Sequence, residues 1–276
     1  MLKSDAQLRL SAFLKTVTQA STRLLMLDYD GTLAPFRKER DQAFPYPGVV
    51  EIVQEILQDT RTRVVIISGR EIADLAPLLE VQPLPEMWGV YGLEHRRPDG
   101  TIEVAHIEKR HLDALSDAHR WLEYQQLGLS AEHKTGSVAL HWRAQTHCES
   151  ERIRFRALLG WKPIADLNGL NILEFDGGIE IRVPGANKGA VVQTLLREIG
   201  TGVPAAYLGD DLTDEDAFRA IGDRGLSVLV RPRYRETAAQ LWLKPPDEVL
   251  NFLTLWRDAC RRDNAMSARA RVGGAV

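Results

Sequence analysis

Residues 24–33 read LLMLDYDGTL, in which four apolar residues run directly into Asp28, Tyr29 and Asp30. The apolar run predicts a buried strand. Two carboxylates at the end of such a strand repel each other and are costly to remove from water, so we expect a positively charged group beside them. The residue that supplies this charge must come from elsewhere in the chain.

Strand-like and helical segments alternate on both sides of an interruption in the middle of the chain. The first strand is followed by the helix-like PGVVEIVQEILQDT (residues 47–60) and the apolar run RVVIISG (residues 63–69). The alternation resumes with NKGAVVQTLLREIG (residues 187–200) and continues through VPAAYLGDD, DEDAFRAIG, LSVLV and PDEVLNFLTLWRDACR. Such a succession is typical of a parallel sheet, so we predict an α/β fold with a doubly wound, Rossmann-like core.

The interruption, residues 98–183, predicts a second and smaller α/β domain. It holds the strand-like GTIEVAHIE, SVALHWRA, LNILEFDG and IEIRVPG, and helices over EKRHLDALSDAHRWLEYQQ and CESERIRFRALLG. Strands grouped with helices indicate a separate sheet with helices on one face. We therefore assign the core to residues 1–97, which begin with a surface helix, and to residues 184–262, and we predict a flexible tail over residues 263–276.

The composition is that of a globular protein and excludes several classes. The chain has 276 residues, 44% hydrophobic and 26% charged, with a formal net charge of −3. It is long enough for a substantial core and lacks the basic field of a nucleic-acid-binding protein. No run approaches the roughly 20 apolar residues of a membrane span. Cys148 and Cys260 are far apart and in no metal-ligand spacing, which favours a reducing compartment and a cytoplasmic location.

Polar clusters fall at the carboxyl ends of the predicted core strands, where open parallel sheets bind their ligands. They comprise Asp28 and Asp30 after the first strand, Ser68 after VVII, Lys188 at a helix start, and Asp210, Asp211 and Asp214 after AAYLG. Each cluster alone is equally explained by a turn, a helix cap or a solvated side chain. Their joint placement at strand ends favours one functional site.

The gathered side chains suit phosphoryl transfer. Several carboxylates at one sheet edge require a cation, and Mg²⁺ fits because it takes oxygen ligands and binds substrate phosphate oxygens. A carboxylate is also a covalent nucleophile towards phosphorus, while a lysine and a hydroxyl can hold the transferred group. We therefore expect one of Asp28 and Asp30 to attack, and the other, on the same side of an extended chain, to handle the leaving-group proton.

Four segments resemble, in order, the four motifs of the haloacid dehalogenase superfamily of phosphotransferases: LDYDGTL, IISGR, NKG and LGDDLTDEDAF. The insert between the second and third motifs is similar to the larger α/β cap of that superfamily, and the match spans residues 23–230. Within the superfamily the chain is most similar to the trehalose-6-phosphate phosphatases, through EHKTGSVALHWR and GIEIRVPGANKGAVV. The resemblance implies a Mg²⁺-dependent phosphoric monoester hydrolase that converts trehalose 6-phosphate to trehalose and phosphate in trehalose biosynthesis.

The resemblance implies a catalytic role for four core residues. Asp28 would be the nucleophile that forms an aspartyl-phosphate, and Asp30 would act as general acid and then as general base. Ser68 and Lys188 would bind the phosphoryl group. These positions match the first three motifs.

The resemblance also implies a metal site. Asp28, the backbone carbonyl of Asp30 and Asp210 would bind Mg²⁺. Asp211 and Asp214 would lie behind these ligands, where Asp214 would hold metal-bound water or orient the motif lysine.

For the sugar, the resemblance implies contacts from the cap and its border: Glu94, Glu132, Lys134, His141, Arg143 and Glu180, with Arg70 and Arg182 as further candidates. One position departs from the family pattern, because in VYGLEHRR Tyr91 stands where family members usually have a histidine. The residues alone leave another interpretation open. The alternation in SVALHWR is equally that of a sheet with one face in water.

The sequence leaves other functions open. A phosphorylatable receiver module shares the acidic residues, hydroxyl and lysine but needs no inserted domain, and a sugar-nucleotide transferase would explain only the Asp-x-Asp pair. Within the resembling fold, the alternatives are a phosphatase for another sugar phosphate, a sugar phosphomutase and a non-catalytic sugar-phosphate sensor. The expected partners are a small-molecule sugar phosphate and, by functional coupling, a trehalose-phosphate synthase, with no nucleic acid and no membrane.

Overall fold

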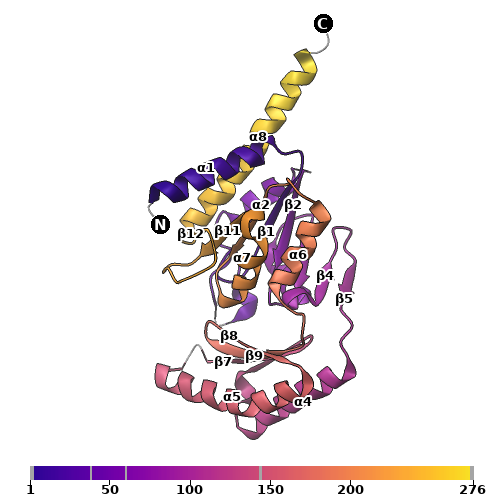
Figure 1. Cartoon of the computed structure of the whole chain (residues 1–276), viewed down its shortest axis with the longest axis vertical. Coiled ribbons are helices and arrows are strands. Elements are labelled where there is room, and N and C mark those ends of the chain that lie inside the picture. Colours follow the sequence, from indigo (N-terminus) through magenta and orange to yellow (C-terminus); the bar gives the residue numbers. More distant parts are fainter. Residues whose placement is uncertain (1–2, 38, 60, 143–144, 274–276) are drawn as a thin grey trace.

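The computed structural model describes residues 3–37, 39–59, 61–142 and 145–273. Within these residues the chain forms two sheets, one of eight strands and one of four, which lie one above the other in Figure 1. The larger sheet belongs to the core and the smaller one to the inserted domain, called the cap below. This arrangement confirms the predicted α/β core with an inserted α/β domain.

The core strands follow the order β12-β11-β10-β1-β2-β3-β4-β5 across the sheet. Their bounds are β1 (Arg23–Leu27), β2 (Thr62–Ile67), β3 (Glu86–Gly89), β4 (Glu94–Arg96), β5 (Ile102–Val104), β10 (Ala205–Gly209), β11 (Leu226–Val230) and β12 (Leu241–Leu243). β1 pairs in parallel with both β2 and β10, so the chain winds outward in opposite directions before and after the cap. The carboxyl ends of β1 and β10 therefore form the topological switch point, where such sheets bind ligands.

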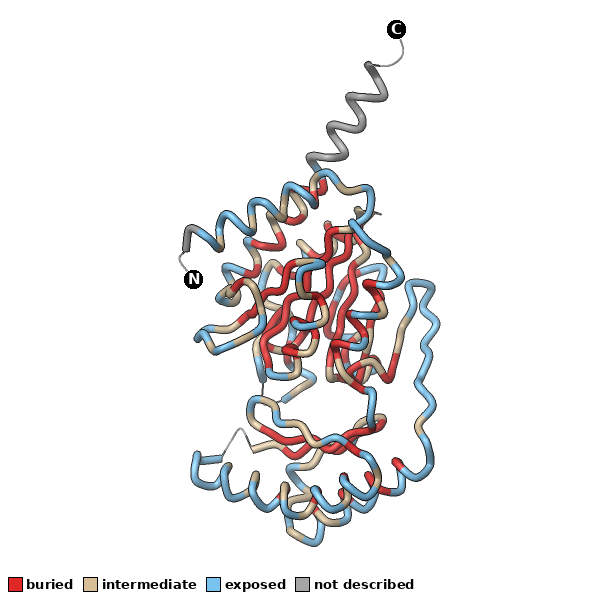
Figure 2. The backbone as a smooth tube through the Cα atoms, viewed as in Figure 1, coloured by how far each residue is buried: buried red, intermediate tan, exposed pale blue. Residues whose placement is uncertain are grey.

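Helices cover both faces of the core sheet. One face packs against α1 (Lys3–Gln19), α2 (Val49–Leu57), α3 (Ile72–Leu79) and α8 (Asp247–Gly273), and the other against α6 (Lys188–Ile199) and α7 (Glu215–Ile221). Leu25 and Leu27 of β1 join the first cluster, and Leu24 and Met26 the second. Because both faces are covered, β1 is apolar from Leu24 to Leu27 and is buried throughout (Figure 2).

The cap is a four-stranded antiparallel sheet with helices on one face only. Its strands are, in spatial order, β6 (Ala131–Lys134), β7 (Ser137–His141), β9 (Gly178–Arg182) and β8 (Asn171–Phe175), and its helices are α4 (Lys109–Tyr124) and α5 (His147–Asn168). Val138 and Leu140 of β7 pack towards the helices. In Figure 1 the helices lie on the side away from the core, so the bare face of the cap sheet is turned towards the switch point.

One strand lies in a different sheet from the one that the sequence predicted. Residues 102–104 were expected in the inserted sheet, but they form β5, which pairs antiparallel with β4 of the core sheet. The turn Pro98-Asp99-Gly100 is the cause, because it folds the chain back on itself, with the Arg97 N–H donating to the Thr101 carbonyl at 2.8 Å. β6 supplies the fourth strand of the cap sheet in place of residues 102–104.

Three short core strands, β3, β4 and β12, were not foreseen. Each has only three or four residues, too few to show a period. The division of the chain at residues 98 and 183 stays a prediction, as does the flexible tail from residue 263. The helix α8 is assigned as far as Gly273.

Two further observations concern the setting of the protein. In the described ranges, no helix has the length and apolar character needed to cross a membrane. Both cysteines are free, Cys148 exposed on the cap and Cys260 buried in the core.

Candidate active site

Charged residues from separate strand ends come together at the switch point. Asp28 follows β1, Asp210 follows β10 and Lys188 opens α6, and all three side chains are buried. One carboxylate oxygen from each of Asp28, Asp210 and Asp214 lies within 4.8 Å of the others. Three carboxylates and one ammonium group therefore share a buried site.

Lys188 and Thr32 hold the carboxylate of Asp28. The Lys188 Nζ donates to Oδ1 at 2.6 Å, and the Thr32 hydroxyl donates to Oδ2 at 2.9 Å. Burial raises the pKa of Asp28 to about 7 although Lys188 acts to lower it, and the charge of Asp214 adds to the rise. Lys188 is thus the positively charged group that was expected beside the carboxylates of residues 28–30. It offsets only part of the effect of burial on the pKa of Asp28.

Asp214 fixes Lys188 from the other side. Its Oδ1 accepts hydrogen bonds from Lys188 Nζ at 2.7 Å and from the Tyr207 hydroxyl. Its Oδ2 accepts from the backbone N–H groups of Asp210 at 3.0 Å and Asp211 at 2.9 Å. Four donors occupy the lone pairs of this carboxylate, so Asp214 orients the lysine and the loop that carries Asp210. The neighbouring carboxylates raise the pKa of Lys188 well above its ordinary value, against the effect of burial.

Asp210 is the carboxylate of the cluster that faces the pocket without a donor. Among the described residues, no hydrogen bond reaches its side-chain oxygens, and it lines the pocket described below. Burial, followed by the charges of Asp28 and Asp211, raises its pKa well above the ordinary value. Gly31, at φ +82°, makes room for it, because a Cβ there would lie 2.3 Å from Asp210 Oδ2. This contact explains the glycine of the DYDGT motif.

The cluster fits a divalent cation. Asp28 and Asp210 offer oxygens that line the pocket, and their pKa values are raised by burial and further by repulsion from the neighbouring carboxylates. A hard cation with oxygen ligands relieves this repulsion. The converging carboxylates are those of Asp28, Asp210 and Asp214, and the side chain of Asp30 is not among them.

Asp30 is held by Arg70. The Nε and Nη2 of Arg70 donate to the two oxygens of Asp30 at 2.6 and 2.7 Å, and its Nη1 donates to the Arg40 carbonyl at 2.8 Å. The buried Ser68 hydroxyl accepts the backbone N–H of Arg70 at 3.1 Å. Arg70, expected to contact substrate, is therefore a partner of Asp30 in this structure.

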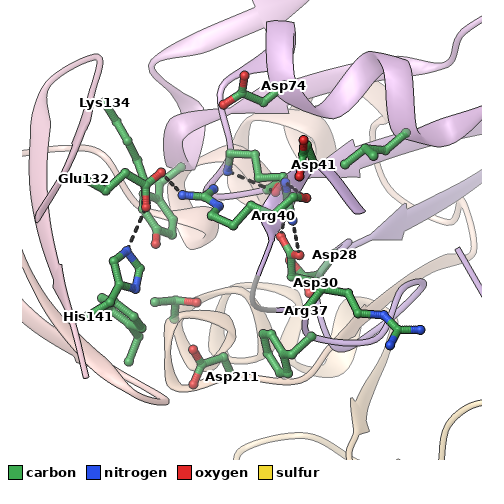
Figure 3. A pocket seen from close by; sticks show the side chains of 18 of the residues that line it. Asp28, Asp30, Arg37, Arg40, Asp41, Asp74, Glu132, Lys134, His141 and Asp211 are labelled. Carbon is green, nitrogen blue, oxygen red and sulfur yellow. Dashed lines mark hydrogen bonds and ion pairs between the residues drawn. The ribbon is translucent and has the colours of Figure 1, made fainter. Parts of the chain in front are cut away.

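A pocket of about 920 Å³ separates this cluster from the bare face of the cap sheet. Figure 3 shows Glu132, Lys134 and His141 projecting into it from the cap. The Oε2 of Glu132 pairs with His141 Nε2 at 2.8 Å, and its Oε1 pairs with Arg40 of the core. The same pocket is lined by the core residues Asp28, Asp30, Ser68, Lys188, Asp210 and Asp211, so both sets of predicted residues meet there.

Two predicted sugar contacts, Glu94 and Glu180, lie outside this pocket. Glu180 is buried in the cap sheet, where its Oε1 accepts from Ser137 at 2.7 Å and from Lys134 at 3.2 Å. Glu94 accepts the backbone N–H of Ile72 at 2.7 Å and the Thr135 hydroxyl at 3.2 Å, so it joins core and cap. Neither glutamate lines the pocket. A further predicted contact, Arg143, lies outside the described residues.

Tyr91 occupies the junction of core and cap. It is buried and has a left-handed φ of 56°. Its ring lies 4.6 Å from the Arg182 guanidinium carbon and 5.6 Å from the Lys134 ammonium nitrogen, both from the cap. Gly69 must be small because a Cβ there would approach the Tyr91 ring to 2.6 Å. The residue that departs from the family pattern thus supports two cap cations through its aromatic face.

Three residues that the sequence interpretation missed support the predicted ones. Thr32 holds Asp28, Tyr207 holds Asp214, and Arg40 pairs with Glu132 across the pocket. Thr32 could have been found, because the turn after the strand places its hydroxyl four residues from Asp28. Arg40 begins a 3-10 helix of only three residues (Arg40–Gln42), which is too short to show a period, so its sequence gives no such signal.

The haloacid dehalogenase class of α/β proteins is defined by carboxylates at the ends of neighbouring parallel strands, a lysine that they share and a cap that faces them. A haloacid dehalogenase-like hydrolase from B. subtilis superposes with a TM-score of 0.59 at 16% identity, over 84% of this chain and 99% of its own, which shows the common fold. The chain belongs to the trehalose-phosphatase family, whose model matches residues 26–244.

Relatives and solved structures agree with this membership. Trehalose-phosphate phosphatases from Mycobacterium marinum and Mycobacterium tuberculosis are each 30% identical over 83% of this chain, which spans only 60% and 59% of their lengths. The structure of Aspergillus fumigatus trehalose-6-phosphate phosphatase superposes with a TM-score of 0.68 at 26% identity, covering 91% of this chain and 97% of its own.

Proposed function

We propose that the protein is a Mg²⁺-dependent phosphatase that hydrolyses trehalose 6-phosphate to trehalose and inorganic phosphate. The observation that carries this proposal is the buried Asp28–Lys188 pair at the floor of a pocket whose opposite wall is the polar face of the cap. The names of the relatives, trehalose-phosphate phosphatase and trehalose-6-phosphate phosphatase, support the substrate. The phosphoryl group would bind to the core and the sugar to the cap.

Asp28 is the nucleophile of the proposed reaction. One of its oxygens forms a bond to phosphorus while the bond from phosphorus to the sugar oxygen breaks, which gives an aspartyl-phosphate and trehalose. Lys188 and Thr32 fix the attacking carboxylate, and Lys188 with Ser68 binds the phosphoryl oxygens. A Mg²⁺ ion held by Asp28, Asp210 and the backbone carbonyl of Asp30 would supply further positive charge to these oxygens.

Asp30 moves the proton. It gives a proton to the leaving sugar oxygen, and then takes one from the water that hydrolyses the aspartyl-phosphate. Both of its oxygens accept hydrogen bonds from Arg70, and these bonds weaken when Asp30 carries a proton, because the carboxyl group is then neutral. Arg70 therefore positions the general acid, and its grip loosens when Asp30 carries the proton.

The cap supplies the sugar contacts. Glu132, Lys134 and His141 present an acceptor, a donor and an imidazole to the pocket, a combination that suits a hydroxyl-rich ligand. A site built to hydrogen-bond hydroxyl groups rejects a ligand that leaves those groups unpaired. The cap thus selects the sugar, and the core performs the chemistry.

The test is a phosphate-release screen. The protein is incubated with Mg²⁺ and trehalose 6-phosphate, sucrose 6-phosphate, glucose 6-phosphate or p-nitrophenyl phosphate, with Asp28→Asn as the blank. We expect trehalose 6-phosphate to give the highest kcat/KM. Preference for another sugar phosphate would contradict the substrate, retention of a sugar bisphosphate would indicate a phosphomutase, and binding without phosphate release would indicate a sensor.

We also propose that the enzyme works beside a trehalose-phosphate synthase in the cytoplasm. A trehalose-phosphate synthase B from Dictyostelium discoideum matches 74% of this chain at 29% identity over 26% of its own length. A free, exposed thiol at Cys148 supports a reducing compartment. Accumulation of trehalose 6-phosphate in cells that lack this chain but keep the synthase would test the coupling.

A further inference from the structure

The turn between β8 and β9 contacts the core at the loop that carries Asp210. The backbone N–H of Asp176 lies 3.2 Å from each carboxylate oxygen of Asp211. The Asp176 carboxylate accepts a hydrogen bond from Arg231 Nη2 at 2.9 Å, and Arg231 Nη1 donates to the backbone carbonyl of Asp210 at 3.3 Å. One core arginine thus joins a cap turn to the backbone of a carboxylate in the cluster.

Arg231 begins a segment, RPRYR (residues 231–235), that has no part in the proposed chemistry. Arg235, at its other end, donates from Nη2 to the backbone carbonyl of Asp211 at 2.8 Å and pairs with Glu215. The two arginines therefore hold consecutive carbonyl groups of the Asp210–Asp211 loop. Of the two, Arg231 also contacts the cap.

The Asp176 contact lies at the end of the cap that is farthest from the connections to the core. The turn at Thr135 and Gly136 packs beside those connections, because a Cβ on Gly136 would lie 3.0 Å from Ile107 and 3.2 Å from Val183. Asp176 lies at the opposite end of the same strands, where β9 begins. A rotation of the cap about its connections therefore moves Asp176 farther than Thr135.

We propose that Asp176 and Arg231 are positioning residues that hold the free end of the cap against the Asp210–Asp211 loop. Cap closure and the placement of Asp210 then depend on the same arginine. The inference rests on the proposed phosphatase function. A sugar phosphate that contacts the cap needs this closure, whereas p-nitrophenyl phosphate has no sugar for the cap to bind.

Charge reversal tests the pair. Asp176→Arg places two cations together, so we expect kcat/KM for trehalose 6-phosphate to fall about tenfold while that for p-nitrophenyl phosphate stays within threefold. Arg231→Asp should lower both, because it also loses the Asp210 carbonyl. Combining the two changes restores opposite charges. Asp176→Arg should therefore raise the sugar-phosphate kcat/KM when it is added to Arg231→Asp.

The matched control is an ion pair inside the cap. Arg154 pairs with Glu174 at 2.7 Å, and both partners are partly exposed, as in the Asp176–Arg231 pair. Arg154→Glu reverses a charge near the same turn without touching the core, so both kcat/KM values should stay within twofold. Equal losses in Arg154→Glu and Asp176→Arg would overturn the proposal, as would a further loss in the double variant.

A distance measurement separates this proposal from the phosphatase function. Cys148 is exposed on the cap, Cys260 is buried, and Arg219 on α7 is exposed, so spin labels on Cys148 and on Arg219→Cys report the distance between cap and core. We expect Asp176→Arg to shift the population to longer distances and Arg154→Glu to leave it unchanged. An unchanged distribution in Asp176→Arg overturns the proposal. Missing phosphatase activity with the expected shift overturns only the proposed function.

Discussion

Replacing Asp28 with asparagine should abolish turnover and at the same time stabilise the metal-free protein. The amide can accept from Lys188 and donate to the Thr32 oxygen, but it carries no charge and cannot attack phosphorus. The Asp28 side chain is buried, and burial raises its pKa from 3.8 to about 7. At about 1.4 kcal/mol per pKa unit, the ionised side chain lowers the free energy of unfolding by roughly 4 kcal/mol.

The effect has a defined dependence on pH. The unfolded chain releases the Asp28 proton near pH 3.8 and the native protein near pH 7, so the native state binds more protons in this window. The stability of the wild type therefore falls as the pH rises from 3.8 to about 7. Asp28→Asn lacks this fall and also removes a charge that raises the pKa of Asp210. We expect almost no difference near pH 4 and a gain of about 2 to 4 kcal/mol at pH 8.

Thermal unfolding followed by circular dichroism in EDTA, from pH 4 to pH 8, measures this gain. At pH 8 the Tm of Asp28→Asn should exceed that of the wild type by about 5 to 10 °C, and Mg²⁺ should narrow the gap by binding to the native wild type. Asp41→Asn, on the exposed part of the pocket wall, is the control and should change neither the Tm at pH 8 nor the effect of Mg²⁺ on it. A gap that does not depend on pH, or a variant less stable than the wild type at pH 8, would refute the reasoning.

Three other perturbations separate the parts of the site. Chelation with EDTA should abolish phosphate release and Ca²⁺ should inhibit it, because its looser coordination misplaces the attacking carboxylate; activity that survives chelation contradicts this. Glu132→Ala or Lys134→Ala should lower kcat/KM for trehalose 6-phosphate by tens-fold, roughly 2 kcal/mol for a lost charged hydrogen bond, and leave p-nitrophenyl phosphate within a few-fold; equal losses on both substrates would indicate a structural role. Arg70→Gln should lower kcat about tenfold on both substrates because Asp30 loses its bidentate partner, whereas a rise in KM for the sugar phosphate alone would make Arg70 a substrate contact.

The core site could be anticipated because parallel strands constrain where their ends lie. Once residues 24–27 are a buried strand, Asp28 must lie at its carboxyl end, and every other parallel strand of the sheet ends at the same edge. Asp210 follows from this rule without knowledge of any side-chain contact, and Lys188 follows because it begins the helix that leads into the parallel strand β10 and therefore lies at the same edge. The hydrogen bond from Lys188 to Asp28 is then the expected answer to a buried carboxylate.

The orientation of side chains that have two polar neighbours could not be anticipated. Arg70 follows Ser68 at a strand end and could face either substrate or Asp30; the structure pairs it with Asp30. Glu180 lies on the core-facing side of its strand, as the alternation predicts, but Ser137 on the neighbouring strand accommodates it within the sheet. Strand periodicity predicts on which face of a sheet a side chain lies. Whether that side chain extends away from the face or bonds within the sheet depends on the residues of the neighbouring strand.

The polar contacts inside the catalytic cluster are more deeply buried than the ion pairs between core and cap, and this difference suits their tasks. The side chains of Lys188, Asp28 and Asp214 are at most 5% exposed, so the attraction between them is little weakened by solvent. The ion pairs that join core and cap are more exposed: Arg231 and Asp176 are 25% and 51% exposed. Exposed pairs contribute about 0.2 to 1 kcal/mol each. The free end of the cap can therefore move away from the core at small cost to admit a sugar phosphate, while the carboxylates and lysine that perform the chemistry keep their positions.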